Sequence, residues 1–149
     1  SWNGTSWTEV GDLNDGRTAL QGSGIATAAL VAGGESPGIV GKTETWNGSA
    51  WTEVNDLNDS RYTAGMSGNA LNTDTLLFGG FAPGATANTE AFDGTSWTEV
   101  ANMANARYTA TGSGVGNGAL ASGSDNNGNP AQASEEWNFA HPVKTIDVS

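Results

Sequence analysis

The sequence predicts an all-β fold built from about three copies of a four-stranded antiparallel unit. A segment of the form WNGTSWTEV recurs at intervals of roughly 45 residues, each copy carries a turn dipeptide between two alternating runs, and no stretch shows a sustained helical period. The chain has 149 residues, 36% of them hydrophobic, which is enough for one domain with its own core. We therefore expect a single repeat domain over residues 1–149.

The third and fourth strands of each unit flank a turn. The dipeptides Asn3-Gly4, Asn47-Gly48 and Asp93-Gly94 are typical of two-residue hairpin turns in which both central residues have positive φ. Residues 43–46 before the turn and 51–54 after it alternate with period two. Each turn is therefore expected to join two strands.

Two further extended runs precede the hairpin in each unit. The first is expected to open at Arg17, Arg61 or Arg107. The second is apolar, spans 28–32 and 75–78, and ends in Gly-Gly, whereas its third copy at 119–121 ends in Ser122-Gly123. Four strands in about 45 residues are typical of a propeller blade.

The order of these features resembles that of kelch repeats, over the whole chain. A glycine pair closes the second strand, an aromatic residue lies in the third, and a tryptophan lies in the fourth. The residues that carry the resemblance are Gly33, Gly34, Gly79 and Gly80; Trp46, Phe92 and Trp137; and Trp7, Trp51 and Trp97. The chain departs from the animal kelch pattern in having Trp or Phe where Tyr is usual, and in losing the first glycine of the third pair.

The resemblance implies kelch-like β-propeller blades. We expect blades over 17–60, 61–106 and 107–149, the last ending in a strand at 143–148, and an orphan outer hairpin with its linker over 1–16. The hairpin of residues 2–10 would leave an unpaired edge. Closed propellers use roughly 4 to 8 blades, so upstream sequence or a second copy of the chain is expected to complete the ring. The start at Ser1 is consistent with processing or with a longer protein.

Composition limits the partners. The net charge of −11 would repel nucleic acid and anionic membrane surfaces. The chain has no cysteine, which excludes disulfides and thiolate metal sites. No apolar stretch approaches the roughly 20 residues that span a bilayer, so membrane insertion is not expected.

Charged and aromatic residues recur at fixed positions of the repeat. Arg17, Arg61 and Arg107 share one position, and Glu44, Glu90 and either Glu135 or Glu136 share another. One interpretation is a ring of ligands at a propeller mouth; the favoured one is a buried Arg–carboxylate pair in each blade. The tryptophans similarly suit a sugar-stacking platform but favour an inter-blade core. Glu9, Glu53 and Glu99 are expected to discourage edge-to-edge sheet pairing rather than to bind metal.

No catalytic constellation stands out, and no cofactor or metal is expected. Copper chemistry of the galactose oxidase type needs several His, Tyr and Cys ligands, but the chain has one histidine, His141, before Pro142. The segment 93–97 is similar to a sialidase Asp box, although its Asp and Gly are adjacent, and equal phasing of the arginines disfavours an arginine triad. Carboxylate pairs for glycoside hydrolysis stay open in so acidic a chain.

Variable loops are the best candidates for binding, because binding residues concentrate on loops over a rigid scaffold. The loop candidates are Glu35, Phe81, Asp125, Asn126, Asn127 and Asn129. The composition of residues 124–130 permits calcium but is more typical of a turn.

Three functions follow in order of preference. The first is a non-enzymatic structural or adhesive component of a virion appendage or extracellular assembly, acting through protein–protein contacts. This location rests on a likeness to short kelch-like repeats of phage and environmental microbial proteins. The second is a carbohydrate-binding propeller module, and the third is a glycoside hydrolase.

Overall fold

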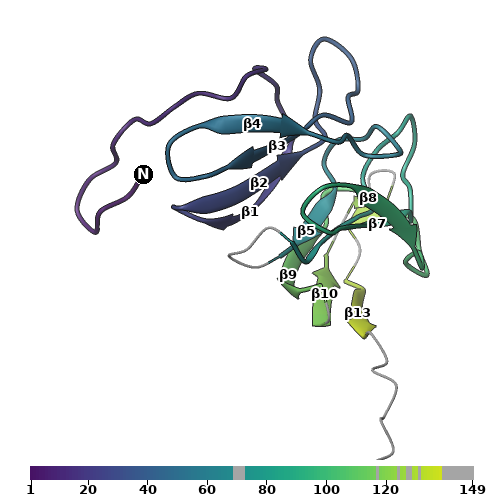
Figure 1. The fold of residues 1–149 in the computed structure, drawn as a ribbon. Coiled ribbons are helices and arrows are strands. Elements are labelled where there is room, and N and C mark those ends of the chain that lie inside the picture. The colour runs from purple at the N-terminus through teal and green to yellow at the C-terminus, as the bar shows by residue number, and fades with distance from the viewer. Residues whose placement is uncertain (69–72, 117, 124, 127–128, 131, 139–149) are drawn as a thin grey trace, which may run out of the picture.

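The protein is all-β in a computed structural model that describes residues 1–68, 73–116, 118–123, 125–126, 129–130 and 132–138 (Figure 1). The described residues form no helix. They form three antiparallel sheets of four, four and three strands and a separate two-stranded ribbon. The expected all-β fold of about three antiparallel units is confirmed, with the expected four strands in the first two sheets and three described strands in the third.

The strands follow one another along the chain. The first sheet contains β1 (Gln21–Ile25), β2 (Ala28–Ala32), β3 (Thr43–Trp46) and β4 (Trp51–Val54). The second contains β5 (Gly65–Ser67), β6 (Thr75–Phe78), β7 (Thr89–Phe92) and β8 (Trp97–Val100). The third contains β9 (Thr111–Val115), β10 (Gly118–Ser122) and β13 (Ser134–Asn138), and the ribbon contains β11 (Asp125–Asn126) and β12 (Asn129–Pro130).

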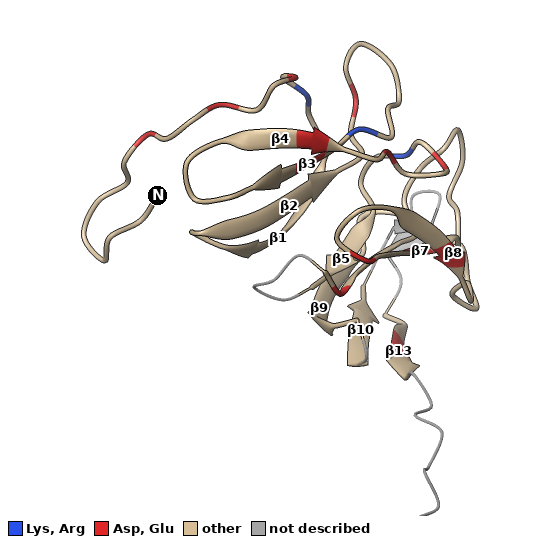
Figure 2. Ribbon diagram, viewed as in Figure 1, with Lys and Arg blue, Asp and Glu red and all other residues tan. Residues whose placement is uncertain are grey.

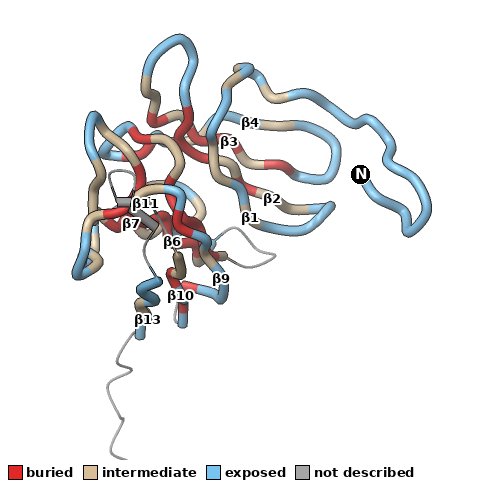
Figure 3. Tube along the Cα trace, turned by 180° about the vertical axis from the view of Figure 1, so that it is seen from behind, coloured by how far each residue is buried: buried red, intermediate tan, exposed pale blue. Residues whose placement is uncertain are grey.

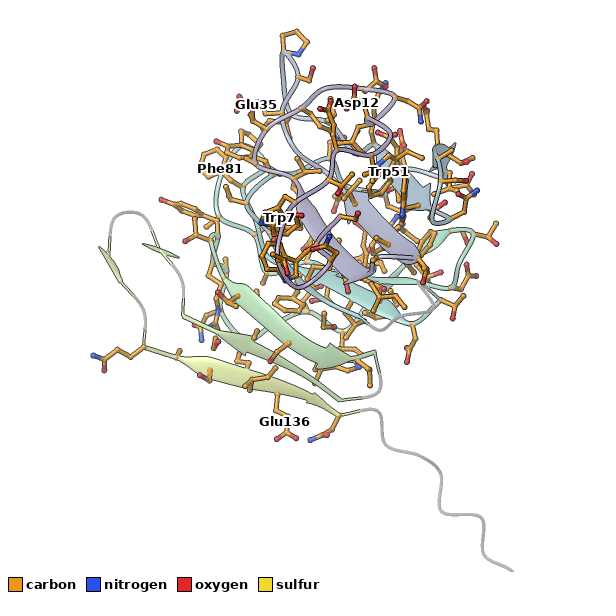
Figure 4. All side chains as sticks on the ribbon, turned by 90° about the vertical axis from the view of Figure 1, so that its left-hand side faces the viewer. Trp7, Asp12, Glu35, Trp51, Phe81 and Glu136 are labelled. Carbon is orange, nitrogen blue, oxygen red and sulfur yellow. The ribbon has the colours of Figure 1, made fainter. Side chains whose placement is uncertain are left out.

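Each sheet is a meander with the same register. Glu44 pairs with Val31, Glu90 with Leu77, and Glu135 with Ala121. Glu135, rather than Glu136, is therefore the third member of the phased carboxylates. Glu136 is exposed and projects from the lower edge of the molecule in Figure 4.

The turns differ from the expected two-residue type. Trp46 pairs with Trp51, so the loop has four residues, 47–50, and its glycine, Gly48, has positive φ whereas Asn47 does not. The Asn47 side-chain oxygen instead accepts hydrogen bonds from the backbone N–H groups of Ser49 and Ala50, both at 2.9 Å. Asn and Asp favour this local capping of a turn, which supplies the reversal without a second strained residue.

The first strands begin four residues after the arginines, so the prediction that they open at Arg17, Arg61 and Arg107 is wrong. The reason lies between the arginine and the strand, where Ala19, Thr63 and Thr109 have φ of 54°, 51° and 59°. Positive φ breaks the extended backbone. The Thr63 N–H donates to the Ala19 carbonyl at 3.0 Å, and the Thr109 N–H donates to the Thr63 carbonyl at 2.7 Å. These hydrogen bonds link successive sheets.

The first strands of the three sheets lie side by side, with β1 against β5 and β5 against β9. The core lies between the sheets in two clusters, one between the first and second sheets and one between the second and third. Figure 3 shows this burial concentrated around the second sheet. The second sheet is thus packed on both faces.

The expected N-terminal hairpin over residues 2–10 is reduced to one bridge between Trp2 and Trp7, and these residues form no strand. Residues 1–10 are exposed throughout (Figure 3). The strand expected at 143–148 lies outside the described residues, and so does His141.

Candidate functional site

The phased charges form a repeated buried network. The Arg17 guanidinium contacts the Glu44 carboxylate at 2.6 Å, and Arg61 contacts Glu90 at 2.9 Å, with all four side chains at most 1% exposed. Arg107 pairs with Glu135 in the third sheet. Figure 2 shows the basic segments near one end of the sheets, where the linkers cross. Each arginine lies in the linker that enters its own sheet and holds that linker to the third strand.

An asparagine completes the network in two of the repeats. The Asn58 backbone N–H and side-chain amide both donate to Glu90 at 2.8 Å, and the amide also donates to the Trp97 carbonyl at 2.9 Å. Asn14 makes the corresponding contacts with Glu44 and Trp51. Sequence reasoning missed these asparagines, although each lies three residues before a phased arginine.

The third repeat lacks the asparagine side chain of this network. Ala104 stands where the asparagine is expected, and only its backbone N–H donates to Glu135, at 2.6 Å. Arg107 keeps its ion pair with Glu135 and also donates to the Ala133 carbonyl at 3.0 Å. The Glu135 side chain is 24% exposed, far more than its counterparts.

The network controls the charge of Glu44. Burial opposes its ionisation, but the Asn14 backbone N–H, the Arg17 guanidinium and the Asn14 amide outweigh that cost and hold the pKa below its ordinary value. Burial lowers the pKa of Arg61, and the charge of Glu90 opposes that effect. These charges serve the packing of each repeat.

The glycine pairs allow the next linker to approach. Gly79 has φ of 64°, and a Cβ there would lie 2.5 Å from the Arg107 carbonyl oxygen. The Gly80 N–H donates to that same oxygen at 2.8 Å. Gly33 and Gly34 stand in the same relation to Arg61. Positive φ together with contact with a neighbouring backbone requires glycine.

The tryptophans divide by repeat between core and surface. Trp97 is 5% exposed, packs on Phe92 with ring centroids 4.9 Å apart, and belongs to the core between the first two sheets. Trp46 is also buried, whereas Trp51 and Trp137 are half-buried. Trp7 is 79% exposed, and Figure 4 shows it on the same side of the molecule as Trp51. The fourth-strand position of the repeat, occupied by Trp7, Trp51 and Trp97, is thus buried in one copy and exposed in another.

The loop candidates do not gather into one site. Glu35 is exposed and Phe81 half-buried at equivalent bridges of the first two sheets. Phe81 packs against Tyr62, at 5.4 Å between ring centroids, and edge-on against Tyr108, at 5.6 Å. Sequence reasoning missed this aromatic cluster, whose signal is the tyrosine directly after Arg61 and directly after Arg107.

The third loop is described only in its backbone. Asp125 and Asn126 pair with Asn129 and Pro130 in the ribbon, and Asn127 lies outside the described residues. The residues between these two strands lie outside the described part of the chain, so the turn expected there stays a prediction.

The remaining charges are at the surface. Glu53 and Glu99 are exposed on the outermost strands of the first two sheets, and Glu9 is exposed in the N-terminal segment. Lys42 pairs with Asp15, both partly exposed. Among the described residues, no three acidic, His or Cys side chains are placed to share a metal ion. No helix capable of crossing a membrane occurs in that part of the chain.

No protein-family model matches the chain, and comparison with curated protein sequences finds no significant match.

Proposed function

We propose that the chain is a non-enzymatic structural or adhesive protein of kelch-like repeats that acts through protein–protein contacts in a virion appendage or an extracellular assembly. The observation that carries the proposal is the contrast between the second sheet, packed on both faces, and the outer sheets, which each keep an apolar face open. The residues of β6 are all buried, whereas in β10 burial alternates, leaving Leu120 43% exposed.

The repeated charges support a scaffold over a catalyst. Glu44 and Glu90 are buried against arginines and accept hydrogen bonds from the linkers that cross them. A carboxylate held in this way is occupied in positioning the backbone. The variable residues lie in loops around the sheets, where protein partners are recognised.

Localisation tests this proposal. An antibody raised against the chain would be used on cells, cell-free medium and sedimented particles of the source, followed by immunogold electron microscopy. We expect labelling of a particle or an extracellular structure. Recovery of the chain only as a free cytosolic protein would overturn the proposal, and so would turnover of a glycoside by the purified chain.

Carbohydrate binding is the second candidate, and one observation favours it. Trp2 and Trp7 are 51% and 79% exposed, and their ring centroids lie 5.5 Å apart. Exposed indole faces suit sugar rings. A glycan array with the chain and its Trp7→Ala variant tests this function, because loss of binding with the fold intact would identify a platform. The Trp46→Ala and Trp97→Ala variants instead report on folding, since both side chains are buried.

A further inference from the structure

The two outer sheets expose opposite faces. In β2 of the first sheet, Leu30 and Ala32 are buried while Ala29 and Val31 are half-buried. In β10 of the third sheet, Ala119 and Ala121 are buried and Leu120 is exposed. Neighbouring residues of a strand point to opposite faces. The shared register equates Leu120 with Leu30 and Leu76, which are 0% and 3% exposed.

The two internal interfaces are built alike. One sheet contributes what we call the inserting face, which carries Leu30, Ala32 and Val54 in the first sheet. The next sheet contributes the receiving face, which carries Leu77 and Trp97 in the second sheet. The second interface repeats this pairing, with Leu76, Phe78 and Val100 on the inserting face and Ala119, Ala121 and Trp137 on the receiving face.

Backbone hydrogen bonds repeat with the side chains. The Thr63 N–H donates to the Ala19 carbonyl at 3.0 Å between the first and second repeats, and the Thr109 N–H donates to the Thr63 carbonyl at 2.7 Å between the second and third. The two interfaces therefore share a register as well as a composition. A receiving face is specific for an inserting face because both backbone and apolar groups must match.

The chain has two outer faces that no other described sheet covers: one is a receiving face and the other is an inserting face. The first sheet leaves its receiving face open, with Val31 and Trp51 at the positions of Leu77 and Trp97. A groove of about 490 Å³ lies on this face, between Ile25, Ala29 and Val31 of the sheet and Trp2 and Trp7 of the N-terminal segment. The third sheet leaves its inserting face open at Leu120.

We propose that two copies of the chain dock head to tail, with the inserting face of one copy's third sheet on the receiving face of the other copy's first sheet. This proposal rests on the proposed function, since it names the partner and surface of those protein contacts. The interface joins two different faces, so it is heterologous, and a second such contact either closes a ring or extends a filament.

Charge affects this docking in a testable direction. Each copy carries a net charge of −11, so two copies repel at low salt. The contact itself is apolar at Leu120, Val31 and Trp51. Salt screens the repulsion over a Debye length of about 8 Å at physiological ionic strength, so association should strengthen as salt is raised.

Two variants, each of which blocks one face, test the proposal on the full chain. Leu120→Asp blocks the inserting face and Val31→Asp blocks the receiving face. Sedimentation velocity should show wild-type assemblies above the 15.1 kDa mass of one chain, and each variant alone should associate at least about tenfold more weakly. Thr98→Asp adds the same charge on the exposed surface of β8 and should assemble as wild type does. Circular dichroism confirms that the variants fold.

Mixing the two variants provides the decisive result. In the mixture, the Leu120→Asp chain keeps an intact receiving face, and the Val31→Asp chain keeps an intact inserting face. These two faces can dock, so a one-to-one dimer should form. Failure of the mixture to associate, while wild type assembles, would overturn head-to-tail docking. A monomeric wild type at high salt and high concentration would also overturn it, yet would leave the proposed function standing if the antibody still labels an assembly.

Discussion

The indole Nε1 of Trp97 donates a hydrogen bond to Thr43 Oγ1 at 3.0 Å, across the boundary between the second and first sheets. Both side chains are buried, and Trp97 lies in the apolar cluster that fills this boundary. The contact thus joins the outer strand of one sheet to the third strand of the preceding one. Trp51 has the same repeat position but lies on the open receiving face of the first sheet.

Replacing these two tryptophans should have very different effects. Trp97→Ala removes a buried ring and should lower the free energy of unfolding by about 3–5 kcal/mol. Trp51→Ala should cost much less, because its side chain is half-buried. Urea unfolding followed by circular dichroism measures both. Equal losses would show that the boundary between the first two sheets contributes no more to stability than the open face does.

The hydrogen bond can be measured separately from the packing. Trp97→Phe keeps an aromatic ring and removes the indole N–H, and it leaves Thr43 Oγ1 without this donor. We expect a loss of about 0.5–1.5 kcal/mol for the hydrogen bond, in addition to the loss from the smaller ring. A double-mutant cycle with Thr43→Val isolates the contact, and a coupling free energy of zero would contradict its role.

The buried pair of Arg61 and Glu90 should show strong asymmetry between single and double substitutions. Arg61→Met leaves the Glu90 carboxylate buried without its cation and should cost about 3–5 kcal/mol in chemical unfolding. Adding Glu90→Gln should recover part of that loss, because no unpaired charge then remains. Lys42→Met at the partly exposed pair with Asp15 is the matched control, and it should change little. Strictly additive losses from Arg61→Met and Glu90→Gln would refute the pairing.

The strands were predicted from the sequence more accurately than the linkers between the sheets were. The alternation in 43–46 and 51–54 predicted β3 and β4 at their observed bounds, because successive side chains of a strand point to opposite faces of its sheet. The strand start at Arg17 was wrong because Ala19 has positive φ, and its carbonyl accepts a hydrogen bond from Thr63 in the next repeat. A single repeat contains no sign of that contact.

The candidate site was predicted in the same uneven way. Phasing predicted the pairing of Arg17 with Glu44 and Arg61 with Glu90, since residues at fixed repeat positions meet in every copy. The phasing could not show that Trp97 is buried while Trp51 is not. The exposure of this side chain depends on whether another sheet packs against its face. The kelch resemblance and the expected location stay predictions.

The Gly79 position should not tolerate a side chain. Gly79→Ala places a Cβ 2.5 Å from the Arg107 carbonyl oxygen at a φ of 64°. The strained backbone alone should cost about 1–2 kcal/mol, and the clash adds to it. Gly84→Ala is the control, because a Cβ there meets nothing within 4 Å. Thermal unfolding should show a lower midpoint for Gly79→Ala only; similar midpoints would mean that the linker does not depend on this close approach.

The Glu44 network should make stability depend on pH in the acid range. Its pKa in the folded chain lies below the ordinary value of 4.5, because the Asn14 and Arg17 hydrogen bonds outweigh burial. The unfolded chain therefore takes up this proton first as the pH falls. The stabilisation from ionised Glu44 is fully present above the ordinary pKa and is lost as the pH falls through the lower, folded pKa.

Glu44→Gln should remove this part of the pH dependence. The difference in free energy of unfolding between wild type and Glu44→Gln should stay constant from neutral pH down to about pH 5 and shrink below it. Urea unfolding at a series of pH values measures that difference, and comparing two proteins cancels the other acidic groups. Asn14→Ala, which imitates the natural Ala104 of the third repeat, keeps the backbone donor and should show an intermediate dependence. A gap that widens in acid would reverse the sign argued for Glu44.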